Sequence, residues 1–252
     1  MFINEALKRM RAGKPALGVA ALLGAPVLAE YLASYGFDFV LIDNQHGIWD
    51  DLTTVQAIRS VLLCHSIPVV RARYNDFSAI GRALEGGALG IIVPMVNTVE
   101  QAQAAAYAMR YPPQGGRSLG PVGVGFMGAD YKARANDEVF LAIQIESREA
   151  VEHAEELLAV EGVDGCWVGP ADLALSMGVD LNTAAGRRLH EEAILHVIDA
   201  CHKTGKFPGL AATPENSEYW IKKGMLFMNC CSDLGFLSTS GPELVARLRH
   251  VG

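Results

Sequence analysis

The stretch that decides the fold is residues 163–178, VDGCWVGPADLALSMG. Within it, Gly165–Val168 is short, apolar and β-prone, and a Gly-Pro pair interrupts the pattern directly afterwards. The residues that follow can begin a helical turn, so the stretch predicts a strand with an acid, Asp172, just beyond its carboxyl end. Ligands bind at that end of the strands in open α/β sheets and in (β/α)8 barrels, which makes Asp172 a candidate site residue. A helix N-cap is the alternative explanation for this aspartate.

The same strand-then-helix pattern occurs eight times along the chain. Strands are expected at residues 16–20, 39–42, 68–71, 89–93, 139–145, 165–168, 206–211 and 226–230. Helices are expected at residues 26–35, 52–64, 78–85, 99–110, 148–160, 186–204, 216–223 and 243–250. Such alternation predicts parallel strands, and eight units at this length favour a closed barrel over a doubly wound sheet.

Length and composition predict a single domain. The chain has 252 residues, of which 50% are hydrophobic and 19% charged. It can bury a full core, and it matches the length of about 250 residues that is typical of one (β/α)8 barrel. We therefore predict an α/β protein with one (β/α)8 TIM-barrel domain over residues 1–252. Residues 1–13, with Phe2, Ala6, Leu7 and Met10 on one side, predict an N-terminal amphipathic helix that closes the barrel floor.

Charge and cysteine content argue against several classes of protein. The formal net charge is −7, and Lys and Arg do not cluster as a nucleic-acid surface requires. The five cysteines form no C-x-x-C pair and have mostly apolar neighbours, so we expect core residues in the reducing environment of the cytoplasm. The apolar run after Lys14 resembles a signal peptide, but it also supplies the first expected strand. No other stretch approaches the roughly 18 consecutive apolar residues of a membrane span.

The longest interruption of the pattern is residues 111–137, which are rich in Gly and Pro. A loop of this length in a compact domain is usually functional or mobile. Residues 123–128, GVGFMG, match G-x-G-x-x-G, but a dinucleotide-binding motif should follow a strand and open a helix, and prolines precede this one. We therefore interpret the segment as a glycine-rich active-site loop and not as a nucleotide site.

Polar side chains follow several of the expected strands at their carboxyl ends. Because the parallel strands of a barrel all end at one rim, these side chains are predicted to converge although they are far apart in sequence. They are Asp43, Gln45 and His46 after the second strand, Arg71 at the third, Gln144 and Glu146 at the fifth, and Asp172 after the sixth.

Two of these residues suggest a metal site. Glu146 and Asp172 are hard oxygen donors on neighbouring strands, which suit Mg²⁺ or Mn²⁺. A buried acid pair without a cation would repel, so a metal is the simpler account. The alternative for Glu146 is an N-cap or first-turn acid of the next helix. Arg71 could bind a carboxylate or keto oxygen, or form a salt bridge across the rim. His46 could transfer protons near neutral pH, or it could be structural.

Six segments together resemble the HpcH/HpaI family of metal-dependent class II pyruvate aldolases. They are LIDNQHG, PVVRAR, GIIVPMVNTVEQA, RYPPQGGRSLGP, IQIESREAVEH and VEGVDGCWVGPADLALSMG, and they span almost the whole chain. The RYPP-G-R and GPADL segments are specific in combination. The resemblance implies a barrel that exchanges its C-terminal helix with a partner subunit and assembles as a homo-hexamer.

The resemblance also implies roles for individual residues. In this sequence His46 matches the general base, and Glu85 matches an aspartate that supports that base. Arg71 matches the residue that stabilises the pyruvate enolate, and Glu146 and Asp172 match the metal ligands. Gln144 and the backbone around Ala171 and Asp172 match the contacts to the pyruvate moiety. The family commonly reads Asp-x-Glu-His where this chain has Asp-Asn-Gln-His at 43–46, and Glu85 is one methylene longer than the usual aspartate. Both departures bear on proton transfer or aldehyde preference and not on the metal pair.

The expected activity is that of a carbon–carbon lyase. It would cleave or form the bond between pyruvate, or a close 2-oxo acid, and an aldehyde, and so act on 4-hydroxy-2-oxo acids with Mg²⁺, Mn²⁺ or Co²⁺. A Schiff-base mechanism is not expected, because no lysine lies at the carboxyl end of an expected strand. Two alternatives remain open, a CoA-thioester lyase of the citrate-lyase type and a barrel that binds oxo acids without turnover.

Overall fold

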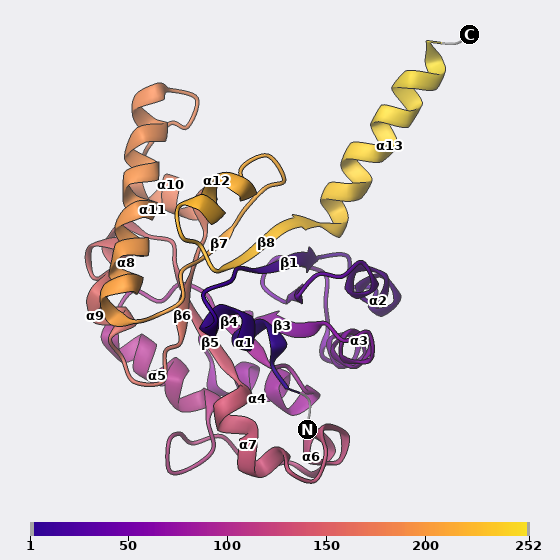
Figure 1. The fold of residues 1–252 in the computed structure, drawn as a ribbon, viewed down its shortest axis with the longest axis vertical. Coiled ribbons are helices and arrows are strands. Elements are labelled where there is room, and N and C mark those ends of the chain that lie inside the picture. The colour runs from indigo at the N-terminus through magenta and orange to yellow at the C-terminus, as the bar shows by residue number, and fades with distance from the viewer. Residues whose placement is uncertain (1–2, 251–252) are drawn as a thin grey trace.

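Eight parallel strands close into a barrel (Figure 1) in the computed structural model, which describes residues 3–250 of the chain apart from the side chain of Val124. Each strand pairs with the next one along the chain, and β8 pairs with β1. The strands are β1 (Ala16–Ala21), β2 (Phe39–Asp43), β3 (Ile67–Arg71), β4 (Gly90–Val93), β5 (Phe140–Ile145), β6 (Gly165–Val168), β7 (Gly209–Ala211) and β8 (Phe227–Ser232). The prediction of a (β/α)8 barrel is confirmed.

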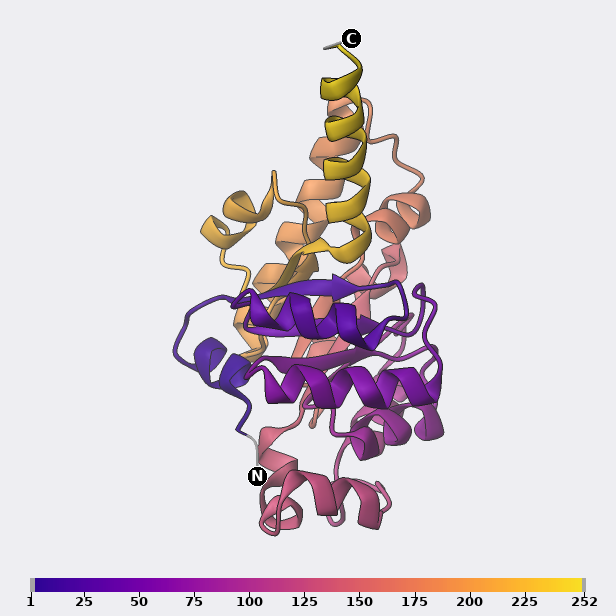
Figure 2. The same cartoon turned by 90° about the vertical axis from the view of Figure 1, so that its right-hand side faces the viewer.

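Helices surround the strands in two views at right angles (Figures 1 and 2). They are α1 (Glu5–Arg11), α2 (Pro26–Ser34), α3 (Asp51–Leu63), α4 (Phe77–Gly86), α5 (Val99–Met109), α6 (Pro121–Met127), α7 (Tyr131–Glu138), α8 (Arg148–Glu152), α9 (Ala154–Leu158), α10 (Pro170–Met177), α11 (Ala184–Thr204), α12 (Ser217–Lys222) and α13 (Asp233–Arg249). Within residues 3–250, the helices are too short or too polar to cross a lipid bilayer.

A layer of aromatic side chains fills the lower part of the barrel interior. Phe39, Phe140, Trp167 and Phe227 come from four strands, and each is at most 2% exposed. The ring of Phe227 lies 4.6 Å from that of Phe39, 4.9 Å from that of Phe140 and 5.0 Å from that of Trp167, measured between centroids. Three of the four are the first residues of their strands. The layer therefore packs the amino end of the barrel and leaves the carboxyl end to polar groups.

The N-terminal helix covers the amino end of the barrel, as predicted. The side chain of Asn4 caps α1 and also donates to the carbonyl oxygens of Leu89 (3.0 Å), directly before β4, and of Glu138 (2.9 Å), two residues before β5. Ala6, Leu7 and Met10 are buried under the helix. Phe2, which was predicted to share this face, lies outside the described residues.

Two of the five cysteines are core residues, as predicted, and the other three are half-buried. Cys166 on β6 and Cys201 on α11 are buried with their Sγ atoms 3.5 Å apart, which joins that strand to the helix covering it.

Three predicted segments differ from the structure. Residues 111–137, predicted as a loop, contain α6 and all but the last residue of α7, and the G-x-G-x-x-G match lies largely within α6. The helix predicted at 148–160 is two short helices that meet at His153. The last helix begins at Asp233 and not at residue 243, and it continues through Pro242. The proline does not end this exposed helix, because it removes only one backbone donor.

Candidate active site

The carboxyl ends of β2, β3, β5 and β6 bring the predicted polar residues to one rim. Asp43 and Arg71 end β2 and β3 and lie directly opposite each other in the parallel register. Gln144 and Glu146 lie at the end of β5, and Asp172 lies in the first turn of α10, directly after β6. The convergence predicted from the sequence is therefore present in the structure.

Asp43 and Arg71 form a buried ion pair at this rim. Arg71 Nε donates to Asp43 Oδ1 at 2.8 Å, and Arg71 Nη2 forms a second bond to Oδ2 of the same carboxylate. The side chain of Asp43 is 2% exposed and that of Arg71 13% exposed. A bidentate pair of this kind fixes the plane of the guanidinium. The salt bridge considered as the alternative role of Arg71 is thus present.

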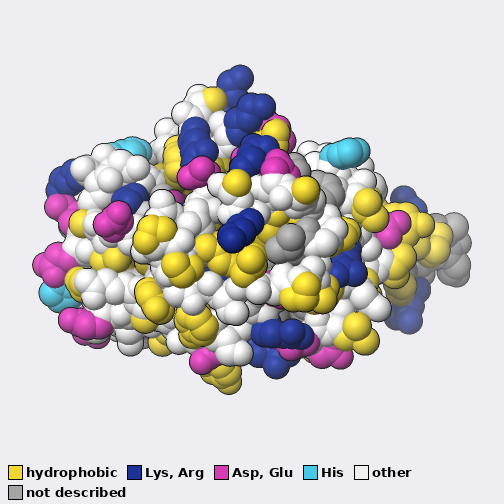
Figure 3. Space-filling model, turned by 90° about the horizontal axis from the view of Figure 1, so that it is seen from below, with side chains coloured by type: hydrophobic (Ala, Val, Ile, Leu, Met, Phe, Trp, Pro, Cys, Tyr) yellow, Lys and Arg dark blue, Asp and Glu magenta, His cyan; other side chains and the backbone are white. Residues whose placement is uncertain are grey.

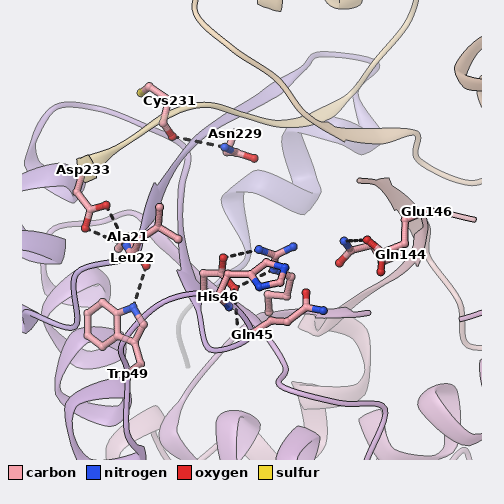
Figure 4. Close-up of polar contacts among 12 residues, drawn as sticks. Ala21, Leu22, Gln45, His46, Trp49, Gln144, Glu146, Asn229, Cys231 and Asp233 are labelled. Carbon is pink, nitrogen blue, oxygen red and sulfur yellow. Dashed lines mark hydrogen bonds and ion pairs between the residues drawn. The ribbon is translucent and has the colours of Figure 1, made fainter. Parts of the chain in front are cut away.

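The turn after β2 is organised by the same carboxylate. Asp43 Oδ1 also accepts from the backbone N–H groups of Gln45 (3.0 Å) and His46 (3.2 Å). The imidazole of His46 is exposed, while the Oε1 atom of Gln45 is buried and no described residue donates to it. Figure 4 shows His46 and Gln45 at the same region of the barrel as Gln144 and Glu146. The geometry leaves the imidazole free to meet a ligand.

Glu146 is a buried carboxylate with two donors. Its Oε1 atom accepts from the backbone N–H of Met95 at 3.0 Å, and its Oε2 atom accepts from Gln144 Nε2. The residue is 2% exposed. Burial raises the pKa of Glu146, and the negative charge of Asp172 raises it further, against the lowering effects of the two hydrogen bonds and of Arg71. The alternative of a helix N-cap is wrong, because Ser147 caps α8.

A glycine gives the Glu146 carboxylate its space. Gly169 is the N-cap of α10, and Pro170 occupies the first helical position. A Cβ atom at residue 169 would lie 2.5 Å from Glu146 Oε2 and 2.9 Å from Gln144 Nε2. Asp172, three residues later, is half-buried and is a first-turn acid, so it is not the N-cap that the alternative required. Ala171, between them, is exposed.

The residues at this rim fit a divalent cation that keeps several of its waters. Glu146 and Asp172 supply two carboxylates close enough to raise the pKa of Glu146, and the buried Oε1 atom of Gln144 has no donor among the described residues. Among these residues, no group of three or more His, Cys, Asp and Glu side chains is placed to hold a metal. A donor set of two carboxylates suits Mg²⁺ or Mn²⁺ and not Zn²⁺.

Glu85 does not join these residues within a single chain. It lies in the last turn of α4, next to the start of β4, where its Oε1 atom accepts from the backbone N–H of Gly123 at 2.9 Å. Helix α6 packs against α4, and α7 packs against α6, so the predicted active-site loop does not lie over the rim of its own barrel. The lower face, where α6 and α7 lie, exposes hydrophobic side chains among charged ones (Figure 3).

Two residues at the barrel mouth, the exposed Met95 and the buried Asn229, were not identified from the sequence. Met95 acts through its backbone N–H and has a positive φ of 57°, and neither property has a sequence signal. Met95 also lines, with Gln45 and Arg73, a cavity of about 460 Å³ beside the rim. Asn229 is a carboxamide inside the apolar strand β8, and its inward position could have been recognised from the two-residue period of that strand.

Residues 19–239 match the HpcH/HpaI aldolase/citrate lyase family. The chain is 35% identical to a 4-hydroxy-2-oxo-heptane-1,7-dioate aldolase from Escherichia coli, over 97% of this chain and 94% of that protein. The solved structure of an HpcH/HpaI aldolase/citrate lyase family protein from Burkholderia cenocepacia J2315 is 28% identical, with a TM-score of 0.89 over 98% of this chain and 99% of that one. A solved citrate synthase is also 28% identical, with a TM-score of 0.87 over 97% of both chains. The chain therefore belongs to the HpcH/HpaI aldolase/citrate lyase family.

Proposed function

We propose that this enzyme, a carbon–carbon lyase of the aldolase type, cleaves 4-hydroxy-2-oxo acids into pyruvate, or a close 2-oxo acid, and an aldehyde, and catalyses the reverse reaction. The observation that supports it most is the buried Glu146 carboxylate beside Asp172, on the same rim as Arg71. The relative named as a 4-hydroxy-2-oxo-heptane-1,7-dioate aldolase, which is 35% identical, supports the same reaction class. The proposal includes that residues 1–252 form a single aldolase domain.

Family membership implies dependence on a divalent metal ion in general. In this chain we assign Glu146 and Asp172 as its ligands and Mg²⁺, Mn²⁺ or Co²⁺ as the ion. When bound, such an ion would act as a Lewis acid toward the oxo acid and stabilise the negative charge that develops on it. The raised pKa of Glu146 supports the assignment, because a neighbouring cation would favour the ionised carboxylate that burial and Asp172 disfavour.

The surrounding residues have complementary tasks. Arg71, which Asp43 holds in place, stabilises the enolate oxygen of the pyruvate unit. Gln144 and the backbone around Ala171 and Asp172 bind the pyruvate unit. His46, whose backbone is held by Asp43 while its ring is exposed, transfers the proton at the aldol hydroxyl.

The family resemblance also assigns Glu85 a role in supporting His46. Within one chain it is hydrogen-bonded to Gly123 and distant from the rim, so this role stays a prediction.

Assembly completes the proposal. Helix α13 extends away from the barrel (Figures 1 and 2), and residues 236–250 are all exposed. Its large exposed hydrophobic side chains are Leu234, Phe236, Leu237, Leu244, Val245 and Leu248. We propose that a partner subunit covers them by exchange of this helix within a homo-hexamer, as the family resemblance implies.

The test is a panel of aldehydes offered with pyruvate and Mg²⁺ or Mn²⁺, with product detection by mass. The proposal expects a 4-hydroxy-2-oxo acid from at least one aldehyde. A CoA-thioester lyase would instead cleave a CoA thioester in a parallel assay. A barrel that binds oxo acids without turnover would bind pyruvate in calorimetry and form no product with any aldehyde.

A further inference from the structure

Asn229 places an unsatisfied hydrogen-bond acceptor inside the barrel mouth. The residue is 8% exposed, and its Oδ1 atom is fully buried with no donor among the described residues. Its Nδ2 atom donates to the carbonyl oxygen of Cys231 at 3.4 Å. This contact forms where the pairing of β8 with β1 shifts register, between Gly18 and Val19. With Nδ2 turned toward Cys231, the Oδ1 acceptor is left without a partner.

Small residues surround this carboxamide. Its partners in the parallel register are Gly18 on β1 and Ala211 on β7. Ala20, two residues after Gly18, faces the same interior because side chains alternate along a strand. The ring of Phe39 lies against Gly18 and closes the barrel below. The β7–β8–β1 side of the mouth therefore carries Asn229 among small residues, and Ser232, the register partner of Ala20, accepts from the backbone N–H of Gly235.

This side faces the groups assigned to the pyruvate unit. Arg71 and Gln144, together with the proposed metal ligand Glu146, lie on or directly after β3 and β5, across the barrel from β8. Figure 4 shows Asn229 on one side of the mouth, with His46 and the pair of Gln144 and Glu146 on the others. The oxygen of Asn229 points away from Cys231, toward the side of Gln144 and Glu146. A second reactant bound beside pyruvate would meet Asn229.

We propose that Asn229 is a specificity-determining residue: it favours, as the aldehyde that reacts with pyruvate, one that carries a hydroxyl group. The inference rests on the proposed aldolase function and specifies its second substrate. A carboxamide oxygen accepts from O–H groups and repels carboxylates. A buried acceptor left without a donor is costly, so an aldehyde that supplies a hydroxyl is favoured over one that lacks it.

The test compares matched aldehydes with pyruvate: propionaldehyde against 2-hydroxypropionaldehyde and 3-hydroxypropionaldehyde. The measured quantity is the ratio of kcat/KM for the better hydroxylated aldehyde to that for propionaldehyde. We expect roughly a 10- to 100-fold preference for the hydroxylated aldehyde in the wild-type enzyme. A ratio is insensitive to a general loss of active protein.

Three kinds of variant complete the design. Asn229→Leu, and Asn229→Ala as a second variant should the first fail to fold, should bring the ratio close to one. Asn229→Asp, which keeps an acceptor in a side chain of the same shape, should retain a preference for the hydroxylated aldehyde. Met228→Leu is the control, because Met228 is the preceding residue of β8, is buried and points away from the interior. It should leave the ratio unchanged.

The outcomes separate this inference from the function on which it rests. Aldol products with no preference in the wild-type enzyme, or a preference that survives in both Asn229→Leu and Asn229→Ala, would overturn the role of Asn229 and leave the aldolase intact. Absence of product from all three aldehydes and from the wider panel would overturn the aldolase itself, and this inference with it.

Discussion

At the scale of single residues, the ion pair between Asp43 and Arg71 determines the orientation of two proposed catalytic groups at the rim. The sequence placed both residues at strand ends and offered a salt bridge as one role of Arg71, but it did not identify Asp43 as the partner, because pairing depends on register and rotamers. The pair holds the guanidinium at a fixed angle and anchors the backbone of His46 through the same carboxylate. A salt bridge and a role in binding the substrate oxygen are therefore compatible for Arg71.

Substitution of Arg71 separates these two roles. Arg71→Ala should lose about 2.7–4 kcal/mol of transition-state stabilisation, as for loss of one oxyanion donor, and Arg71→Lys should restore only part because an ammonium cannot form the bidentate fork. The measurements are kcat and kcat/KM for each variant, with Asp43→Asn as a control that breaks the pair and keeps the guanidinium. Near wild-type rates in both Arg71 variants, with only a lower melting temperature, would reduce Arg71 to a structural residue.

The buried carboxylate of Glu146 predicts a pH-dependent stability in the metal-free protein. Burial, and then Asp172, raise its pKa above the ordinary value of 4.5. The fold thus favours the protonated form, and the destabilisation is absent below pH 4.5 and complete above the raised pKa. Glu146→Gln removes this titration. In chelator, the melting temperature of Glu146→Gln minus that of the wild type should therefore increase as the pH rises from 4.5. A difference that stays constant up to pH 8 would contradict the raised pKa.

Among the site residues, the sequence predicted the position of side chains that directly follow a strand, but not of groups whose position depends on an unusual backbone conformation. Glu146, Asp172, Asp43 and Arg71 could be assigned to one rim because parallel strands end together. The N–H group of Met95 reaches Glu146 only through a left-handed backbone conformation, which the sequence does not predict for a methionine.

At the scale of elements, tertiary contacts explain the wrong prediction for residues 111–137. The sequence of α6, PVGVGFM, has little helix propensity, yet the N–H of Gly123 bonds to Glu85 on α4. Arg117 lies over the rings of Tyr111, at 4.4 Å, and Tyr131, at 5.5 Å, and donates to the Tyr131 hydroxyl at 2.7 Å. These contacts join distant residues, so local propensity and glycine content could not reveal them.

The start of α10 provides a prediction at the same scale. In Gly169→Ala the new Cβ would overlap the Glu146 carboxylate and the Gln144 amide, which must then move. We expect weaker affinity for Mn²⁺ by calorimetry and lower activity, with the fold retained by circular dichroism. Gly81→Ala, where an added Cβ meets nothing within 4 Å, is the matched control. Unchanged Mn²⁺ affinity in Gly169→Ala would show that this close approach does not position the ligand.

At the scale of the whole molecule, α13 predicts an oligomer. Its start is fixed to the barrel by Asp233, whose carboxylate accepts from the N–H groups of Leu22 (3.0 and 2.9 Å) and Leu23 (3.0 Å). The sequence predicted a helix at residues 243–250 but not its start at Asp233 or its projection from the barrel, because the contacts that fix the start join distant parts of the chain. Deletion of α13 should dissociate the assembly and lower the melting temperature. A monomeric mass for the wild type in light scattering at micromolar concentration would contradict helix exchange.

The central proposal, that Glu146 and Asp172 hold the divalent ion on which aldol cleavage depends, is tested on the activity of the whole enzyme. The measurement is the initial rate of pyruvate release from a 4-hydroxy-2-oxo acid by chelator-treated enzyme, as Mg²⁺ or Mn²⁺ is titrated back. We predict no cleavage without the ion, full recovery in the wild type, and no recovery in Glu146→Gln at concentrations that saturate the wild type. Full cleavage by the metal-free wild type, or by Glu146→Gln, would contradict the proposal.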